Sequence, residues 1–503
     1  MRYFQCEMDW GEIAKLYAVC LVFGILAYGY NIFNFALSID GENVDNFHQT
    51  ISLGRWGHAF IRYYFLPEPF VPYFTNLVSV IFLCLAAVLS AKAIGLENLG
   101  LYAFSALFIS FPALSYQFEF INQSDTVSIG YFFAVLGAFS FLQREGQTSL
   151  TRILLIVFSC LLFIFVTAIY QALIMVPILI VLGRFLLDSY SRVNGFRFYA
   201  KNLALFVFIV LFSVFIYSAL TIAIKEKFLG AAGASNGYLL HFVNGSGSFA
   251  AILNQALINV GAGISGQVRY GFSTYIVATF VAGLVVAGAF LQKKGSYVSR
   301  SFLMLGVLFA PFAIIIFSGS YIPGRVLVAT NLAFAIIVVN TLRGMVGRMA
   351  AIAGMFVAVL FLINISMITA LFYSDSATRE RDVRLATQIT MVMAVNNPDF
   401  DPNLVPVYFH GGIRAASQYK IPNSDVFGSS FFTWDYGNNR RLVRFFEYYG
   451  FGKFKMATKD QILGIKSKIS TMPVWPNPDS IRLVDGVMVV KLNQKPGVLP
   501  FVY

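Results

Sequence analysis

The sequence is poor in charged residues, in cysteine and in histidine. Only 12% of its 503 residues are charged, whereas 58% are hydrophobic and 53 are phenylalanine. A soluble domain of this length has no core large enough for so much apolar surface. The composition therefore excludes an ordinary soluble protein and predicts that a lipid bilayer surrounds much of the chain.

The few cysteines and histidines exclude the common metal sites. Cys6, Cys20, Cys84 and Cys160 form no CxxC pair, and the four histidines are scattered without metal-ligand spacing, so a zinc or iron–sulfur site is excluded. All four cysteines precede residue 161, so the C-terminal part of the chain needs no disulfide. The sequence implies no cofactor, and a divalent cation, although compatible with the sequence, has no specific support in it.

The net charge of +12 does not indicate a nucleic-acid partner. Most basic residues before residue 373 sit in short loops between apolar segments, where the positive-inside rule explains them. The N-terminus is polar and acidic before a long apolar run without a small-residue cleavage site. We therefore expect a retained first helix and no signal peptide.

Eleven apolar segments are long enough to predict membrane-spanning helices, since a span needs about 20 mainly apolar residues. The stretch 150–187 is too long for one span but is interrupted by Tyr170 and Gln171, so we predict two short crossings there. The predicted spans are Leu16–Leu37, Tyr73–Leu89, Leu99–Leu114, Thr126–Leu142, Ile153–Ile169, Leu173–Leu187, Leu203–Ile224, Thr274–Leu291, Phe302–Phe317, Val326–Thr341 and Met349–Phe372.

The distribution of basic residues predicts the orientation. Eleven crossings with a cytoplasmic N-terminus place fourteen Lys and Arg in inner segments and six in outer segments before residue 373. We therefore expect residues 373–503 on the outer side. This tail holds 16 Lys and Arg and 11 Asp and Glu, and it forms a second domain after the transmembrane domain of residues 1–372.

The tail has the pattern of a small α/β domain. Residues 376–395, Arg440–Tyr449 and Lys459–Ile469 have helical patterns, and Val405–Phe409 has the pattern of a strand. Ile481–Val484 and Val487–Lys491, joined by Asp485-Gly486, predict a hairpin.

Three outer loops are more than connectors. Residues 38–72 contain the aromatic run His58–Leu66, which predicts a helix lying in the membrane interface. Residues 225–273 contain the apolar run Ala250–Val260, which we also expect at the interface. Residues 318–325 predict a tight turn that places Arg325 at the outer end of a helix.

Carboxylates in two of these outer regions are candidate catalytic groups. Asp40, Glu42 and Asp45 directly follow the first span, where a carboxylate can accept a proton from an acceptor hydroxyl; alternatively, they form a helix-ending turn. Glu119 and Asp125 lie between the third and fourth spans. They either bind sugar hydroxyls or a cation, or Ser124 or Asp125 caps the fourth helix.

Arginine and aromatic residues supply candidate binding groups. Arg55 and Arg325 lie on the outer side, where the positive-inside rule disfavours them. A guanidinium suits bidentate phosphate binding, although either arginine alone could extend to lipid headgroups. Candidate sugar contacts are Trp56, Tyr170, Gln171, Phe431, Trp434 and Asp435; the alternatives are that Gln171 satisfies backbone groups and that residues 428–436 form core and turn.

These motifs occur in a characteristic order, from the acidic loop through Gly54-Arg55-Trp56, residues 118–125, Tyr170-Gln171 and Pro323-Gly324-Arg325 to Phe431-Phe432-Thr433-Trp434-Asp435. The order resembles that of the Gtr-type O-antigen glucosyltransferases, the serotype-converting enzymes. The resemblance implies a GT-C-type enzyme of the bacterial inner membrane with a periplasmic C-terminal domain.

The resemblance also implies ligands and roles. The donor would be undecaprenyl-phosphate-glucose and the acceptor an O-antigen polysaccharide, with separate proteins that synthesise and flip the donor as potential partners. Asp40 would be the catalytic base beside Glu42 and Asp45, and Arg55 and Arg325 would bind the phosphate.

We therefore predict an inverting single displacement with Asp40 as base. Two alternatives remain: an O-antigen polymerase or ligase, and a flippase or transporter of lipid-linked sugars. A transporter should carry charged residues within its spans, whereas the predicted spans contain only Arg184, near an inner end.

Overall fold

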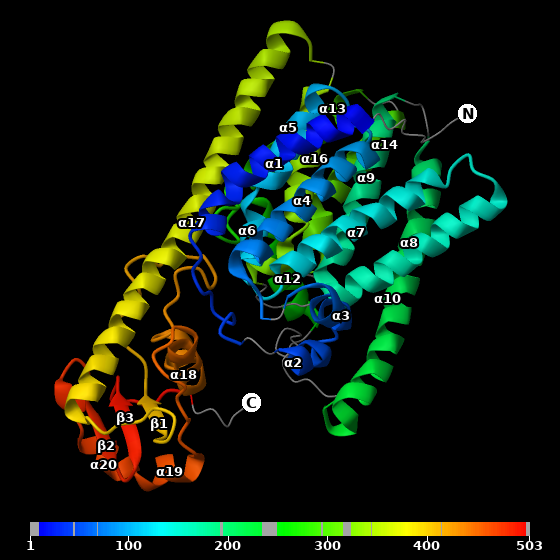
Figure 1. Cartoon of the computed structure of the whole chain (residues 1–503). Helices are drawn as coiled ribbons and strands as arrows, with labels where there is room; N and C mark the ends of the chain where they lie inside the picture. Colours follow the sequence, from blue (N-terminus) through cyan, green and yellow to red (C-terminus); the bar gives the residue numbers. More distant parts are fainter. Residues whose placement is uncertain are drawn as a thin grey trace. The chain divides into compact units, whose positions relative to one another are not determined.

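The computed structural model describes residues 10–43, 46–67, 69–191, 195–233, 249–292, 295–314, 323–343, 345–413 and 415–498 (Figure 1). The chain divides into two compact units. The first comprises Met1–Phe33 with Asp45–Thr369, and the second comprises Asn34–Val44 with Ala370–Tyr503.

The first unit is entirely helical in its described residues. Its α-helices are α1 (Trp10–Phe33), α2 (Phe47–Ser52), α3 (Trp56–Phe65), α4 (Pro72–Ile94), α5 (Leu99–Ser110), α6 (Ser115–Phe118), α7 (Ser124–Gln143), α8 (Ser149–Ile169), α9 (Met175–Ser191), α10 (Phe196–Gly233), α12 (Phe249–Ile264), α13 (Tyr275–Gln292), α14 (Gly295–Phe309), α16 (Thr330–Leu342) and the first part of α17 (Gly347–Asn396). Short 3-10 helices are η1 (Pro112–Leu114), η2 (Gln171–Ile174), η3 (Ala310–Phe312) and η4 (Gly324–Leu327).

The membrane class predicted from the sequence is confirmed. Within the described residues, eight helices are long and apolar enough to cross a bilayer, and three shorter apolar helices accompany them. Each of these eleven helices overlaps one of the eleven predicted segments, although α1 ends at Phe33, before the predicted end at Leu37. Residues 315–317, at the end of one predicted span, lie outside the described part of the chain.

The long apolar stretch divides where the sequence predicted. Helix α8 ends at Ile169, Tyr170 takes an extended backbone conformation, and η2 and α9 follow. Tyr170 and Gln171 therefore lie at the junction between two helices.

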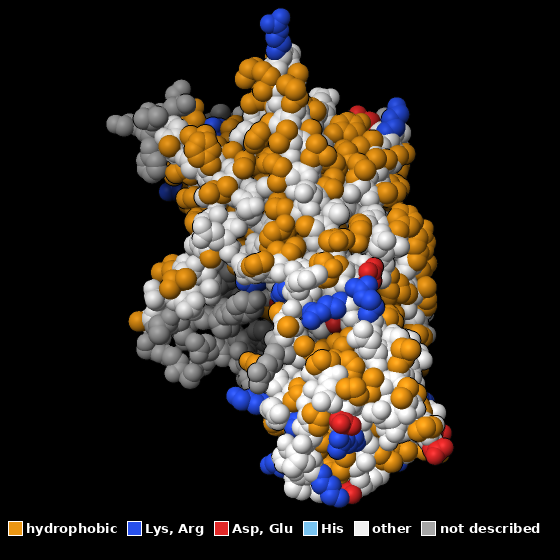
Figure 2. Space-filling view, turned by 90° about the vertical axis from the view of Figure 1, so that its left-hand side faces the viewer, with side chains coloured by type: hydrophobic (Ala, Val, Ile, Leu, Met, Phe, Trp, Pro, Cys, Tyr) orange, Lys and Arg blue, Asp and Glu red, His pale blue; other side chains and the backbone are white. Residues whose placement is uncertain are grey.

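The helices of this unit pack closely, as α4 and α7 do in Figure 1. Small residues allow the close approach at two other helix pairs. A Cβ atom on Gly137 of α7 would lie 2.6 Å from the Phe163 side chain of α8, and one on Gly24 of α1 would lie 2.6 Å from Val80 of α4. Close approach at small residues is typical of helix packing in membranes. Hydrophobic side chains cover much of the helical surface that faces the viewer in Figure 2.

The predicted amphipathic helix in the first outer loop is present as α3. In α3 the side chains of Phe60, Tyr63, Tyr64 and Phe65 are exposed, whereas those of His58, Ile61 and Arg62 are buried. The apolar run of the second loop lies within α12. Their location at the membrane interface stays a prediction. Residues 318–322 of the predicted turn lie outside the described residues, and Arg325 lies in η4, before α16.

The second unit contains a three-stranded sheet in the order β1-β3-β2, with β1 (Val407–His410), β2 (Ile481–Val484) and β3 (Val487–Lys491). The hairpin β2–β3 is confirmed, and Asp485 and Gly486 both have the positive φ that a tight hairpin turn requires. Strand β1 pairs in parallel with β3. Besides the end of α17, the helices are α18 (Asn439–Tyr448), α19 (Lys459–Gly464) and α20 (Lys466–Thr471), with short η5 (Trp434–Tyr436) and η6 (Pro478–Ser480).

Two details differ from the sequence prediction. The segment 376–395 is not a separate helix but the end of the continuous 50-residue α17. The single helix expected over Lys459–Ile469 is two short helices that meet at Ile465. In both cases hydrophobic periodicity indicates which helix face is buried. It does not indicate where one helix ends or whether two helical segments are continuous.

The acidic segment after α1 belongs to the second unit. Residues 34–44 group with residues 370–503, although they directly follow the first spanning helix in the sequence. This segment therefore supplies its side chains to the C-terminal unit.

Candidate functional site

Arg55 and Arg325 are brought together in the first unit around Tyr170. The Arg55 guanidinium lies over the Tyr170 ring, 4.8 Å from its centroid, and the Tyr170 hydroxyl donates to the Arg325 backbone carbonyl at 3.4 Å. Both arginines are half-buried, whereas Tyr170 is buried. Two residues 270 positions apart in the sequence thus contact the same tyrosine, Arg55 through its guanidinium and Arg325 through its backbone carbonyl.

The loop before α7 contacts both arginine side chains. Arg55 Nη1 donates to Gln123 Oε1 at 3.0 Å, and the Arg325 guanidinium lies 4.4 Å from the centroid of the Phe120 ring. A ring packed on the face of a guanidinium fixes its plane and leaves its N–H groups to act along the edges. Arg55, Arg325, Tyr170, Phe120 and Gln123 are referred to below as the arginine cluster.

The turn that carries Arg55 is held by hydrogen bonds from two helices. Gln171 Nε2 donates to the Leu53 carbonyl at 3.0 Å and to the Tyr217 hydroxyl at 2.9 Å, and that hydroxyl donates to the Gly54 carbonyl at 3.0 Å. Trp56 Nε1 donates to Thr221 Oγ1 at 3.1 Å. Gln171 and Trp56 therefore position Arg55 in this structure.

Asp125 forms a buried ion pair with Arg62. The Asp125 side chain is fully buried, accepts a hydrogen bond from Arg62 Nη2, and also accepts one from the Thr126 amide at 2.7 Å. Arg62 belongs to α3 and Asp125 to the first turn of α7, so the pair attaches α3 to the spanning helix. This contact supports a positioning role for Asp125.

His58 strengthens the same attachment. Its Nδ1 lies 2.6 Å from Thr126 Oγ1, and the Thr126 hydroxyl itself donates to the Gln123 carbonyl, so the histidine nitrogen is the donor. Burial, with smaller contributions from the nearby Arg62 and Arg55, lowers the pKa of His58 to about 3. The ring is therefore neutral at ordinary pH.

Asp40 lies in a strained turn of the second unit. The Gly41 amide donates to the Ser38 carbonyl at 3.1 Å, and Asp40, the third residue of this turn, has φ +77°. Glycine is the usual residue at that position of a turn, because other L-residues are disfavoured with positive φ. The chain therefore keeps a carboxylate at a position where its backbone carries a conformational cost.

Arg441 of α18 binds three carboxylates. Its Nη2 donates to Asp40 Oδ1 at 2.8 Å, its Nη1 donates to Glu42 Oε1, and its Nε donates to Asp435 Oδ2 at 2.9 Å. The next helical turn adds Arg444, which donates to Asn43. Asp40, Glu42, Asp435 and Arg441 are referred to below as the carboxylate cluster; they all belong to the second unit.

Exposure separates the two carboxylates of the loop. The Asp40 side chain is 41% exposed, whereas that of Glu42 is 0% exposed, so an external hydroxyl can reach Asp40 but not Glu42. Burial raises the pKa of Glu42, although Arg441 opposes this shift. Asp45 lies outside the described residues.

The remaining predicted residues differ in accessibility. Glu119 is buried at the end of α6. Phe431 is fully buried against Phe445 and beneath Arg379, so its ring belongs to the core; Trp434 and Asp435 are half-buried.

Arg441 has no counterpart among the residues predicted from the sequence. Arg441 lies in the first turn of α18, which is capped by Asn438, and no local pattern distinguishes it from its neighbour Arg440. In the described part of the chain, no group of three or more His, Cys, Asp or Glu side chains could hold a metal ion.

These features define a polytopic helical membrane protein with an arginine cluster in its transmembrane unit and an exposed carboxylate in its second unit. The chain belongs to the glucosyl transferase GtrII family, whose sequence profile matches residues 29–342. It is thus a glycosyltransferase of glucosyl-transferring type, and the matched region includes Asp40, Arg55 and Arg325.

Other comparisons add little to this assignment. The chain is similar to ArnT from Cupriavidus metallidurans, whose crystal structure is bound to undecaprenyl phosphate, with 11% identity, a TM-score of 0.44 and coverage of 92% of this chain and 88% of that chain. No curated protein matches the chain.

Proposed function

We propose that this protein transfers glucose from undecaprenyl-phosphate-glucose to a hydroxyl of an O-antigen repeat unit on the periplasmic face of the inner membrane, as a GT-C-type enzyme. The observation that carries the proposal is the arginine cluster. Two half-buried arginines that both contact Tyr170, each with its guanidinium against an aromatic ring, suit a phosphate-linked donor in a member of a glucosyl transferase family.

The reaction is a single displacement at the anomeric carbon. The bond between C1 of glucose and the carrier phosphate oxygen breaks, and a bond between C1 and the acceptor oxygen forms with inversion. The acceptor proton passes to the Asp40 carboxylate, and the leaving group is undecaprenyl phosphate.

The arginine cluster stabilises the leaving group. Negative charge grows on the carrier phosphate as the bond breaks, and preorganised guanidinium groups favour that charge without reorganising during the step. The Tyr170 and Phe120 rings and Gln123 fix the two side chains before the donor arrives. A fixed orientation reduces the conformational entropy lost on binding.

Asp40 is the base because it is the accessible carboxylate of its cluster. Its Oδ1 is bound by Arg441, and its side chain is 41% exposed. The positive φ of Asp40 supports the assignment, because strained backbone is commonly retained where a side chain has a function. Glu42 and Asp435 share the same arginine and help to fix its position.

We further propose that the N-terminus is cytoplasmic and that the domain of residues 373–503 is periplasmic. The basis is the fourteen-to-six distribution of basic residues. A reporter fused after Tyr503 should be active only if it is a periplasmic reporter; activity of a cytoplasm-specific reporter at that position would refute the orientation.

The proposal is tested with purified protein and radiolabelled undecaprenyl-phosphate-glucose. Arg55→Lys and Arg325→Lys each keep the charge but lose the planar fork, so we expect donor turnover to fall at least roughly tenfold in each variant. Arg152→Lys is the matched control, since Arg152 is an arginine of α8 outside the cluster, and its turnover should be unchanged.

Two outcomes would contradict the proposal. Native turnover in both cluster variants would show that neither arginine binds the phosphate. Movement of the lipid-linked sugar across a bilayer without cleavage of the sugar–phosphate bond would identify a flippase.

A further inference from the structure

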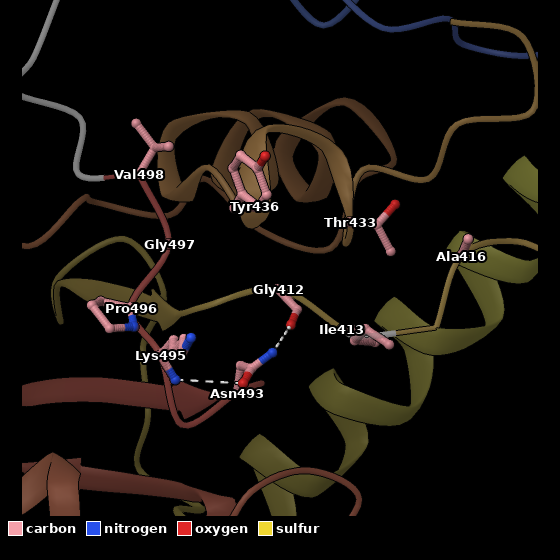
Figure 3. Close-up of a pocket in the computed structure, with 10 residues that line it drawn as sticks. All are labelled: Gly412, Ile413, Ala416, Thr433, Tyr436, Asn493, Lys495, Pro496, Gly497 and Val498. Carbon is pink, nitrogen blue, oxygen red and sulfur yellow. Dashed lines mark hydrogen bonds between the residues drawn. The ribbon is translucent and has the colours of Figure 1, made fainter.

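The second unit contains a cavity of about 580 Å³ beside η5 (Figure 3). Its volume is within the range of small-molecule sites, roughly 300–1,000 Å³. Thr433 and Tyr436 line it from η5 and its preceding turn, and Gly412 and the C-terminal segment line the opposite side. The residues of that segment are Asn493, Lys495, Pro496, Gly497 and Val498.

Tyr436 is an exposed aromatic residue in the lining of this cavity. Its side chain is 84% exposed, which is unusual for a large aromatic residue in a folded domain. Asp435, Tyr436 and Gly437 have φ values of +50°, +57° and +88°, so two consecutive non-glycine residues occupy the left-handed region. A left-handed backbone raises the conformational free energy of a non-glycine residue. Here it occurs in the segment that places Asp435 against Arg441 and Tyr436 in the lining of the cavity.

Backbone and side-chain contacts fix the segments that line the cavity. A Cβ atom on Gly437 would lie 2.3 Å from the backbone of Gly411, and Asn493 Nδ2 donates to the Gly412 carbonyl at 2.8 Å. The Lys495 amide donates to Asn493 Oδ1 at 3.4 Å, as drawn in Figure 3. The close approach of Gly437 to Gly411 joins the η5 side of the cavity to the opposite side, and the two hydrogen bonds of Asn493 hold that opposite side together, as expected of a preformed site.

The cavity is joined to the carboxylate cluster through adjacent residues. Tyr436 follows Asp435 in the sequence, and Asp435 shares Arg441 with Asp40. A group bound on the Tyr436 ring is therefore held by the same turn that helps to position Arg441.

We propose that this cavity is a subsite for one sugar residue of the acceptor glycan, with the Tyr436 ring as its stacking surface. The inference rests on the proposed function for the identity of the glycan. A pyranose has one face of C–H groups and a rim of hydroxyls; the C–H face packs on the electron-rich face of an aromatic ring, and the hydroxyls need donors and acceptors.

The lining matches that chemistry better than it matches a lipid or a phosphate. Tyr436 is accompanied in the lining by Thr433, Lys495 and Gly412, which bring a hydroxyl, an ammonium group and peptide groups to this part of the unit. Among the described lining residues, Lys495 alone is charged, whereas phosphate sites usually combine several cations or a series of amide donors. An acyl chain would leave these polar groups without partners.

The test measures glycan binding and transfer separately on the full-length protein in detergent. The probe is delipidated O-polysaccharide from the strain that carries the gene, detected by saturation-transfer NMR. Tyr436→Ala should weaken its binding about tenfold, as loss of an aromatic anchor does, and should raise KM for the acceptor but not for the donor. Tyr436→Phe keeps the ring and should retain most of the affinity.

Tyr373→Ala is the matched control, because Tyr373 is an exposed tyrosine of the same unit outside the cavity. It should leave binding and both KM values unchanged. Wild-type binding that is equally strong in Tyr436→Ala, or no binding with unchanged acceptor KM, would overturn the subsite.

The subsite and the proposed function can fail separately. If the wild-type protein transfers glucose and Tyr436→Ala has a native acceptor KM, the subsite fails and the proposed function stands. If the wild-type protein binds the polysaccharide through Tyr436 but cleaves no donor, the subsite stands and the proposed function fails.

Discussion

Replacing Asp40 with glycine and with alanine distinguishes two effects: the conformational strain of the residue-40 backbone and the catalytic role of the Asp40 carboxylate. Both variants remove the carboxylate and its contact with Arg441 in the same way. They differ in that glycine adopts φ +77° freely, whereas alanine is strained there. The comparison of the two variants therefore isolates the backbone.

The expected magnitude follows from the turn. A non-glycine residue in the left-handed region costs about 1–2 kcal/mol, so Asp40→Gly should be more stable than Asp40→Ala by about 1 kcal/mol. The lost ion pair contributes little to this difference, since it is absent from both variants and the Asp40 side chain is 41% exposed. In contrast, both variants should lose transfer by about 10²–10⁴-fold, the usual effect of removing a general base.

The assay is denaturant unfolding of the two variants in the same detergent, together with glucose transfer by each. Equal stabilities would show that residue 40 is not held in the strained turn. Near-native transfer by Asp40→Gly would refute its role as base, whatever the stabilities show.

Three further predictions address the supports of the two clusters. The folded-state pKa of His58, about 3, is below its unfolded value of about 6.5, so the stability due to the neutral ring is present above pH 6.5 and is lost as pH falls towards 3. The free energy of unfolding should fall between pH 6.5 and pH 5, and the fall should be about 2 kcal/mol larger in wild type than in His58→Asn. An equal fall in the two proteins would contradict this prediction. Arg441→Gln leaves the buried Glu42 carboxylate without its cation and should lower the free energy of unfolding by about 3 kcal/mol. Adding Glu42→Gln should restore part of that stability, as measured by thermal unfolding. If the double variant is no more stable than the single one, Arg441 does not compensate Glu42. Gly54→Ala forces φ +77° on alanine and places its Cβ 2.7 Å from the Tyr217 hydroxyl, so it should displace Arg55 and raise the donor KM several-fold; an unchanged KM would show that this turn does not position Arg55.

The sequence predicts the membrane architecture well, because each spanning helix has to satisfy its backbone internally and bury apolar side chains in lipid. That requirement produces long apolar runs, and all eleven predicted segments overlap apolar helices of the described structure. The hairpin was predictable for a different reason. Asp485-Gly486 is a two-residue turn between two short strands, and this local signal sets the register.

Candidate site residues can be proposed from the sequence, but their contacts cannot. Outer arginines are conspicuous against the positive-inside rule, so the sequence predicts Arg55 and Arg325 as phosphate ligands but does not show that both contact Tyr170. Arg441 and Tyr436 were not selected, because their roles depend on contacts across long sequence separations and on positive φ angles. Neither feature has a local pattern.

Asp125 illustrates the converse. Its charge at a helix start suggested either ligand binding or capping, whereas the structure pairs it with Arg62, 63 positions earlier in the chain. Such pairing cannot be recognised from either residue alone.

The central claim is tested most directly by glucose transfer in wild type and in Asp40→Asn. The assay supplies purified protein with undecaprenyl-phosphate-glucose and O-polysaccharide, and it measures donor binding on the same preparation. The account predicts that wild type transfers glucose with inversion, and that Asp40→Asn binds the donor normally but transfers about 10²–10⁴-fold more slowly. Near-native transfer by Asp40→Asn, with loss of transfer in Glu42→Gln or Asp125→Asn, would contradict it.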